Sequence, residues 1–346
     1  MGIAVNQAGD TFHLYNDEIS YIMNVLPNNQ LGQIYFGKRI EIPEDCTYFV
    51  ETLMRPMSSC VFDTDKRFSM EYIRQEYAVF GTSDYRMPAV TVLQENGSRI
   101  SEFCFRGYQI RAGKPGSAGN PASYVENEEE AETLVIELTD QVSGLELELY
   151  YTIFAAGGII ARSARFINRG GQTLHLLSAM SLCLDLPDHD YEWLQFSGAW
   201  ARERWLKKRS LEYGVLAVDS ARGHSSHEQN PFIVLKRPSA DEFQGEVMGF
   251  SLVYSGNFLA QAEVESHGTT RILLGVNPFC FDWKLEPGES FQTPEAVLVY
   301  SHRGLNDMSQ TFHRLFQRRL ARGFWRDRPR PILINNWEAT YFDFTE

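Results

Sequence analysis

Carboxylates that stand close together in the sequence are the first candidates for general acid and base chemistry. They occur as Asp63 with Asp65, and as Asp188 and Asp190 with Glu192. Acid and base catalysis needs two carboxyl groups that converge across a pocket, and closeness along the chain does not provide this convergence. We interpret these residues as polar turns or solvated strand ends, and we expect no catalytic residue among them.

Two histidines at a spacing of three residues, His224 and His227 in GHSSH, are the candidates for metal binding. They lack a third ligand and any helical pattern around them, which favours structural hydrogen bonding. The sequence contains no HExxH, GxSxG or GxGxxG motif. We therefore expect no metal and no cofactor.

The last stretch, residues 330–346, joins an apolar run to a polar and aromatic cluster. The run at 332–334 is Ile-Leu-Ile, which suits a strand buried on both faces. The residues that follow, among them Asn335, Trp337 and Tyr341, are typical of a barrel strand that opens onto a site at its carboxyl end. An ordinary edge strand followed by a polar tail fits the same letters, and the residues do not decide between the two.

The elements that must position these residues are mostly strands. The segment GLELELYYTIF at 144–154 alternates Leu and Tyr with Glu, a period of two that places one face on a core. Further strands are expected at 133–138, 159–168, 174–184, 232–236, 246–254, 271–276 and 295–300. The sequence therefore predicts an all-β fold, a large antiparallel β-sandwich.

One helix is expected, at 306–322, because Met308, Phe312 and Leu315 follow a period of 3.6 residues. Asp307 and Gln310 have the spacing of a capping box at its start. Its position after the last predicted strand makes it a short helical connector to the closing stretch.

The composition of the chain limits which classes of partner it can bind and in which cellular compartment we expect it. The 346 residues carry a formal net charge of -13, which disfavours nucleic acid and anionic membrane surfaces as partners. The five scattered cysteines form no CxxC pair, and the first residues do not resemble a secretory signal, so we expect a cytoplasmic protein. No apolar run approaches the ~20 residues of a membrane-spanning helix.

Four long motifs carry a resemblance to a known family. They are RQEYAVFGTSDYRMPA at 74–89, RGHSSHEQNPF at 222–232, WKLEPGESFQTPEAVLVYS at 283–301 and RPILINNWEATYFDF at 330–344. In this order they resemble the bacterial α-galactosidases of glycoside hydrolase family 36. In that family a β-supersandwich, similar in fold to galactose mutarotase, precedes a (β/α)8 barrel that supplies both catalytic aspartates.

The resemblance implies three parts: a β-supersandwich at 1–302, a helical connector at 303–329, and the start of a truncated barrel, a stub of its first strand, at 330–346. It implies a parent enzyme that retains configuration while it removes terminal α-galactosyl residues from melibiose- or raffinose-like sugars. Because both aspartates lie beyond Glu346 in this family, we expect this chain alone to be inactive. Two alternatives are a stand-alone carbohydrate-binding module, and a mutarotase-like sugar epimerase with a His and Glu pair in a concave face.

The resemblance also implies three substrate-binding residues. Trp337 matches a tryptophan that lines the galactose subsite. Trp200, in GAWARERW, matches a tryptophan that reaches into the barrel of a neighbouring subunit in the family's homotetramers. Lys66 stands in a loop with the same role, at a place where the family more often has Arg, so the planar fork of a guanidinium is lost. For Asp84 and Arg86 we expect an ion pair that fixes a turn.

Overall fold

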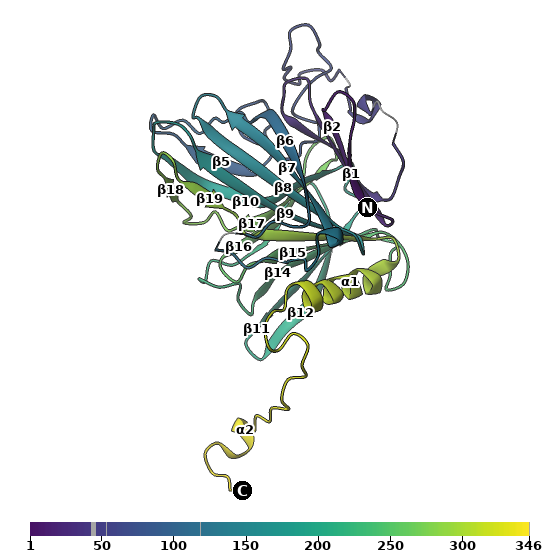
Figure 1. Ribbon diagram of the computed structural model, residues 1–346, viewed down its shortest axis with the longest axis vertical. Helices are drawn as coiled ribbons and strands as arrows, with labels where there is room; N and C mark the ends of the chain where they lie inside the picture. The colour runs from purple at the N-terminus through teal and green to yellow at the C-terminus, as the bar shows by residue number, and fades with distance from the viewer. Residues whose placement is uncertain (43–45, 53, 118, 346) are drawn as a thin grey trace.

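The computed structural model describes residues 1–42, 46–52, 54–117 and 119–345, and it consists largely of antiparallel β-sheet (Figure 1). The strands form sheets of four, six and ten strands. All pairs of named strands in the described ranges are antiparallel. The predicted all-β fold, a large antiparallel β-sandwich, is confirmed.

The ten-stranded sheet is the largest element. Its strands, in spatial order, are β12 (Arg202–Ser210), β11 (Glu192–Ala199), β14 (Gln229–Lys236), β15 (Val247–Val253), β20 (Glu295–Ser301), β9 (Ile159–Asn168), β8 (Leu145–Phe154), β7 (Ala131–Asp140) and β6 (Cys104–Ala112). The short strand β19 (Ser290–Gln292) pairs with β9 outside this path.

The other two sheets complete the body. The six-stranded sheet runs β13 (Gly214–Asp219), β16 (Phe258–Val264), β17 (Thr270–Val276), β10 (Leu174–Leu186) and β18 (Trp283–Leu285), and β5 (Val90–Leu93) also pairs with β10. The four-stranded sheet runs β1 (Gly2–Val5), β2 (Thr11–Tyr15), β3 (Ile19–Val25) and β4 (Leu31–Lys38). One large cluster of buried apolar residues includes members of all three sheets.

Strand β8 shows how the sequence produces this core. Leu145, Leu147, Leu149 and Tyr151 are buried in the main apolar cluster, while the alternate residues from Glu146 to Tyr150 are partly exposed. Successive side chains of a strand point to opposite faces, so the two-residue period of the sequence fixes which face of the sheet is buried.

The helix α1 (Gly304–Arg319) lies against the outer face of the ten-stranded sheet (Figure 1). Met308, Phe312 and Leu315 join a second apolar cluster with residues of β20 and β15. The capping box predicted at Asp307 is wrong. Asp307 instead accepts a hydrogen bond from the Ser301 hydroxyl at 2.7 Å and forms an ion pair with Arg303.

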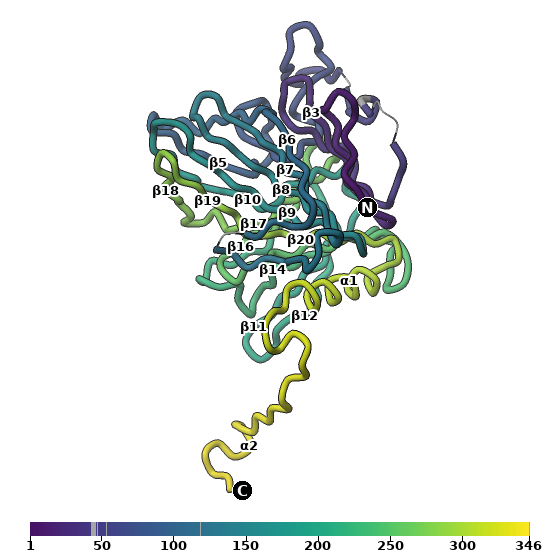
Figure 2. The backbone as a smooth tube through the Cα atoms, viewed as in Figure 1, coloured from purple at the N-terminus to yellow at the C-terminus, as the bar shows by residue number. Residues whose placement is uncertain are grey.

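Beyond α1 the chain leaves the body as an extended tail (Figure 2). The apolar run is exposed there, with Ile332 at 97% of its full accessible surface. Residues 331–336 form no strand, and the short helix α2 (Trp337–Thr340) follows them. A strand needs hydrogen bonds from a neighbouring strand, and the described body provides none here, so the barrel-strand interpretation stays a prediction. No helix in the described ranges has the length and apolarity to span a bilayer.

Candidate functional site

The first predicted site residue, Trp337, begins α2 in the tail, and its side chain is half exposed. Its ring contacts only its own segment: the centroid distances are 5.3 Å to Tyr341 and 4.9 Å to Phe342. Asn335 accepts a hydrogen bond from the Trp337 amide at 3.1 Å. The tail thus forms a small local aromatic group whose outward faces have no cover from the described body.

The second, Trp200, lies at the turn between β11 and β12 and is 80% exposed. The turn is tight, because a Cβ on Gly198 would lie 2.3 Å from the carbonyl oxygen of Arg202. The Glu203 carboxylate accepts a hydrogen bond from the Ala201 amide at 3.0 Å and so braces the turn. Strand β12 is exposed along its whole length and forms the edge of the sheet. The hairpin therefore presents Trp200 outward at the rim of the body.

The third, Lys66, lies in an exposed loop. Its ammonium group stands 3.7 Å from Asp63 Oδ1, and both side chains are largely exposed. The neighbouring Arg67 donates instead to Asp65, with 3.0 Å between Nε and Oδ1. These hydrogen bonds from Arg67 lower the pKa of the Asp65 carboxyl. Lys66 therefore keeps most of its ammonium group available to a further partner.

The structure does not bring Trp337, Trp200 and Lys66 together within one chain. No contact among the three appears in the described ranges, and the tail that carries Trp337 extends away from the body (Figure 1). Their roles in substrate binding stay predictions.

Two of the carboxylates that the sequence offered for catalysis, Asp188 and Glu192, form ion pairs with basic side chains. Asp188 binds Arg237, and Glu192 binds Lys236 at 2.7 Å and Lys208 at 3.1 Å. These contacts favour the interpretation of these two carboxylates as structural groups. His224 accepts a hydrogen bond from the Ser226 amide at 2.9 Å through Nδ1, and no cluster of metal-ligating side chains occurs in the part of the chain that the structure describes.

Sequence reasoning missed a buried network of four charges. Arg271 contacts Asp185 at 2.7 Å and Asp84 at 2.8 Å, while Arg86 contacts Asp84 at 2.8 Å. The Gln75 amide donates to Asp185 at 2.8 Å. The two guanidinium groups outweigh burial and keep the pKa of Asp185 below its ordinary value. The Asp84–Arg86 pair predicted to fix a turn is confirmed, and it is one half of this network.

A second buried network surrounds Glu76. Its carboxylate contacts Arg162 at 2.7 Å and accepts hydrogen bonds from the hydroxyls of Tyr21 at 2.6 Å and Tyr151 at 2.9 Å. Burial raises the pKa of Glu76 to about 7. These four side chains are all buried. Both networks anchor the irregular segment 74–86 to the sheets, which explains why this motif is rich in charge and lies in no strand.

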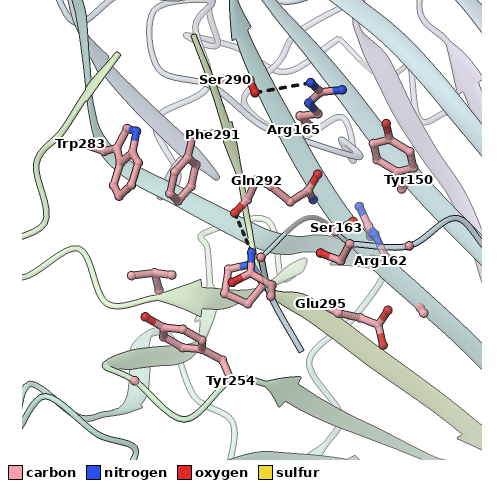
Figure 3. A pocket seen from close by; sticks show the side chains of 18 of the residues that line it. Tyr150, Arg162, Ser163, Arg165, Tyr254, Trp283, Ser290, Phe291, Gln292 and Glu295 are labelled. Atoms are coloured by element: carbon pink, nitrogen blue, oxygen red, sulfur yellow. Dashed lines mark hydrogen bonds between the residues drawn. The ribbon is translucent and has the colours of Figure 1, made fainter. Parts of the chain in front are cut away.

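A half-open cavity of about 780 Å³ lies on the face of the ten-stranded sheet that also carries α1. Strands β8, β9 and β19 and the loops after β15 and β17 contribute its walls (Figure 3). Its lining includes one carboxylate, Glu295, and no histidine among the described residues. A mutarotase-like pair of His and Glu is therefore not assembled in this cavity.

Comparison with known proteins assigns the family. Residues 29–286 match the profile of the glycosyl hydrolase family 36 N-terminal domain. The chain belongs to this family. Residues 290–346 match a second profile, described as melibiase. The recognised resemblance to family 36 α-galactosidases, and the placement of the chain in their N-terminal part, are confirmed.

The relatives give the extent of this match. An α-galactosidase, AgaA, from Geobacillus stearothermophilus is 51% identical over 346 residues, which cover 100% of this chain and 47% of the relative. The crystal structure of the family 36 α-galactosidase AgaB from the same organism has a TM-score of 0.94 and 50% identity, covering 100% of this chain and 47% of that one. A Lactobacillus brevis α-galactosidase has a TM-score of 0.96 and 44% identity, covering 99% and 46%. The chain thus spans about half the length of these family 36 enzymes.

Proposed function

We propose that this chain is the N-terminal portion of a retaining α-galactosidase that removes terminal α-galactosyl residues from melibiose- or raffinose-type sugars. The observation that carries the proposal is that the whole chain matches family 36 α-galactosidases and covers 47% of their length. A structure of a Geobacillus stearothermophilus AgaA variant in complex with raffinose supports the substrate class.

The proposed enzyme divides its labour among three segments of this chain and a barrel beyond them. Residues 1–302 form the supersandwich, residues 303–329 connect, and residues 330–346 begin a catalytic barrel. The exposed apolar run at 332–334 supports this division, because burial in a barrel would remove an apolar surface that the body leaves in water. Both catalytic aspartates would lie on the barrel beyond this chain, about 5 Å apart as retention requires.

Trp337 would cover the apolar face of the bound galactose, and Trp200 and Lys66 would complete the pocket of a neighbouring subunit in a homotetramer. The outward positions of Trp200 and Lys66 on the body support a role between subunits. We also propose a cytoplasmic location, which would preserve the exposed thiol of Cys280.

A fusion enzyme tests the proposal. This chain is joined to the C-terminal remainder of the 51% identical Geobacillus stearothermophilus enzyme, and hydrolysis of 4-nitrophenyl α-galactoside is measured for the fusion and for the chain alone. We expect turnover by the fusion, with retained anomeric configuration in the first product seen by NMR, and none above a blank by the chain alone. Turnover by the chain alone would place the catalytic machinery within these residues and refute the proposal.

Two substitutions in the fusion test the proposed pocket. Trp337→Ala and Trp200→Ala should each lower kcat/KM by roughly thirtyfold, the effect of truncating a tryptophan that contributes about 2 kcal/mol. Trp325→Ala in the tail and Trp205→Ala in the same hairpin serve as matched controls, because both tryptophans are also exposed. Equal activity of the test and control variants would show that the assigned tryptophans do not contact substrate.

A further inference from the structure

The half-open cavity of the sandwich is lined by many aromatic side chains. Six aromatic side chains contribute to it: Tyr150, Tyr254, Phe279, Phe281, Trp283 and Phe291. Trp283 and Phe291 stand side by side, with 4.9 Å between ring centroids, and Tyr254 lies across from them in the same hollow (Figure 3). Its volume of about 780 Å³ falls within the range of about 300–1,000 Å³ that is usual for small-molecule sites.

Polar side chains lie among these aromatic rings, and some of their hydrogen-bond donors have no partner within the described chain. Arg165 donates to the Ser290 hydroxyl at 3.4 Å (Figure 3). The Gln292 side-chain amide donates to the Ala164 carbonyl at 3.2 Å. Within the described chain, the Tyr254 hydroxyl and the Trp283 indole N–H have no hydrogen-bond partner. Both groups are therefore available to a ligand.

Most charged residues of the cavity lining have an oppositely charged partner within the protein. Arg162 contacts Glu76 at 2.7 Å, and Arg165 lies 3.7 Å from Glu148. Lys114 contacts Glu295 at 2.6 Å, and both side chains are almost fully buried. Glu295 also accepts hydrogen bonds from the amide of Ser123 at 2.9 Å and from its hydroxyl at 2.7 Å. The single carboxylate of the lining is neutralised by Lys114. The cavity therefore has no pair of acids for hydrolysis and no unpaired negative charge that would attract a cationic ligand.

We propose that this cavity is a binding site for a short neutral oligosaccharide. The flat apolar faces of Trp283 and Tyr254 suit the C–H faces of sugar rings, while the amides, hydroxyls and guanidinium around them suit sugar hydroxyl groups. The site would hold a sugar without changing it. Its walls include β8, β9 and β19 of the sandwich, and Figure 1 shows these strands apart from the tail that carries α2. The proposal does not depend on the chain being part of a hydrolase.

Calorimetric titration of this chain tests the site, with raffinose, maltotriose and inorganic phosphate as separate probes. We expect saturable one-site binding of at least one of the two oligosaccharides and none of phosphate. Trp283→Ala should weaken sugar binding at least tenfold. Tyr254→Phe removes only a hydroxyl that has no partner in the described chain, and it should weaken binding about threefold without affecting the fold.

Trp205→Ala is the matched control, because Trp205 is an exposed tryptophan on β12 that does not line the cavity. It should bind sugar like the unaltered chain. If circular dichroism shows that Trp283→Ala is unfolded, Tyr254→Phe decides. Absence of saturable sugar binding, unchanged affinity in the cavity variants, or binding of phosphate in place of sugar would each overturn the proposal. Because no turnover is measured, this result is independent of the hydrolase test.

Discussion

The body and the tail of this chain differ in which side chains they place in an unfavourable environment: the body buries charged side chains, and the tail exposes apolar ones. In the body even charged side chains are buried, and Arg271, Asp185 and Asp84 satisfy one another at 2.7–2.8 Å. In the tail, apolar side chains that normally belong in a core stand in water, with Leu333 at 89% exposure. Stability must therefore reside in the body, because the apolar run of the tail is not buried against it. Four measurements test this contrast.

The largest effect is expected for Arg271→Leu. The change leaves the buried carboxylates Asp84 and Asp185 with one guanidinium in place of two, and breaking a buried ion pair costs about 3–5 kcal/mol. Urea unfolding followed by circular dichroism measures the loss. Arg106→Leu is the control, since its pair with Glu146 is exposed and is worth about 0–1 kcal/mol. A loss below about 1 kcal/mol for Arg271→Leu would show that the network is not a source of stability.

Gly304→Ala should come next. Gly304 begins α1 with a φ of 80°, and a Cβ there would lie 2.5 Å from the carbonyl oxygen of Asp241. The clash of an added methyl group with backbone atoms costs about 1–3 kcal/mol. Gly288→Ala is the matched control, because Gly288 has a φ of 86° and nothing within 4 Å of its Cβ position. The difference between the two variants in urea unfolding isolates the steric clash, and equal losses would exclude it.

The pH dependence of Glu76 should give a smaller but specific signal. Its pKa is raised by burial from an ordinary 4.5 to about 7 in the folded protein. Between these values the folded state binds a proton that the unfolded state has lost, so stability falls as pH rises through this window. Glu76→Gln should remove this fall, which corresponds to about one proton. Identical slopes of unfolding free energy against pH in both proteins would contradict the assignment.

The smallest effect is expected in the tail. Replacing Ile332, Leu333 and Ile334 by Ser should change the free energy of unfolding by less than about 0.5 kcal/mol, because these side chains contact nothing that unfolding would expose. Light scattering should report less self-association, since an apolar patch has been removed. A clear fall in the urea midpoint would mean that the tail packs on the body.

Local periodicity explains which parts of the fold the sequence could predict. Strand β9 lies at 159–168 as predicted, and α1 begins two residues before its predicted start. The strand pattern and the helix period can both be seen within a single continuous segment of the sequence. The capping box failed because Ser301 and Arg303, outside the motif, compete for Asp307.

Features that join distant segments could not be predicted in this way. The buried charges come from positions 84, 86, 185 and 271, and the lining of the cavity comes from seven separate stretches of the chain. The spacing of these residues along the sequence does not predict that they come together in the fold. The family resemblance singled out Trp200, Trp337 and Lys66 as substrate-binding residues. The structure brings no two of them into contact within the described residues, and their roles stay predictions.

The basic side chains of the edge strand β12 should affect the rate of association with a partner surface. It exposes five basic side chains, Arg202, Arg204, Lys207, Lys208 and Arg209, on a protein whose formal net charge is -13. A positive rim on a negative body orients an approaching acidic surface before contact, over a Debye length of about 8 Å at physiological ionic strength. Encounters through the Trp200 hairpin should therefore be fast in dilute buffer and slow progressively as salt is added.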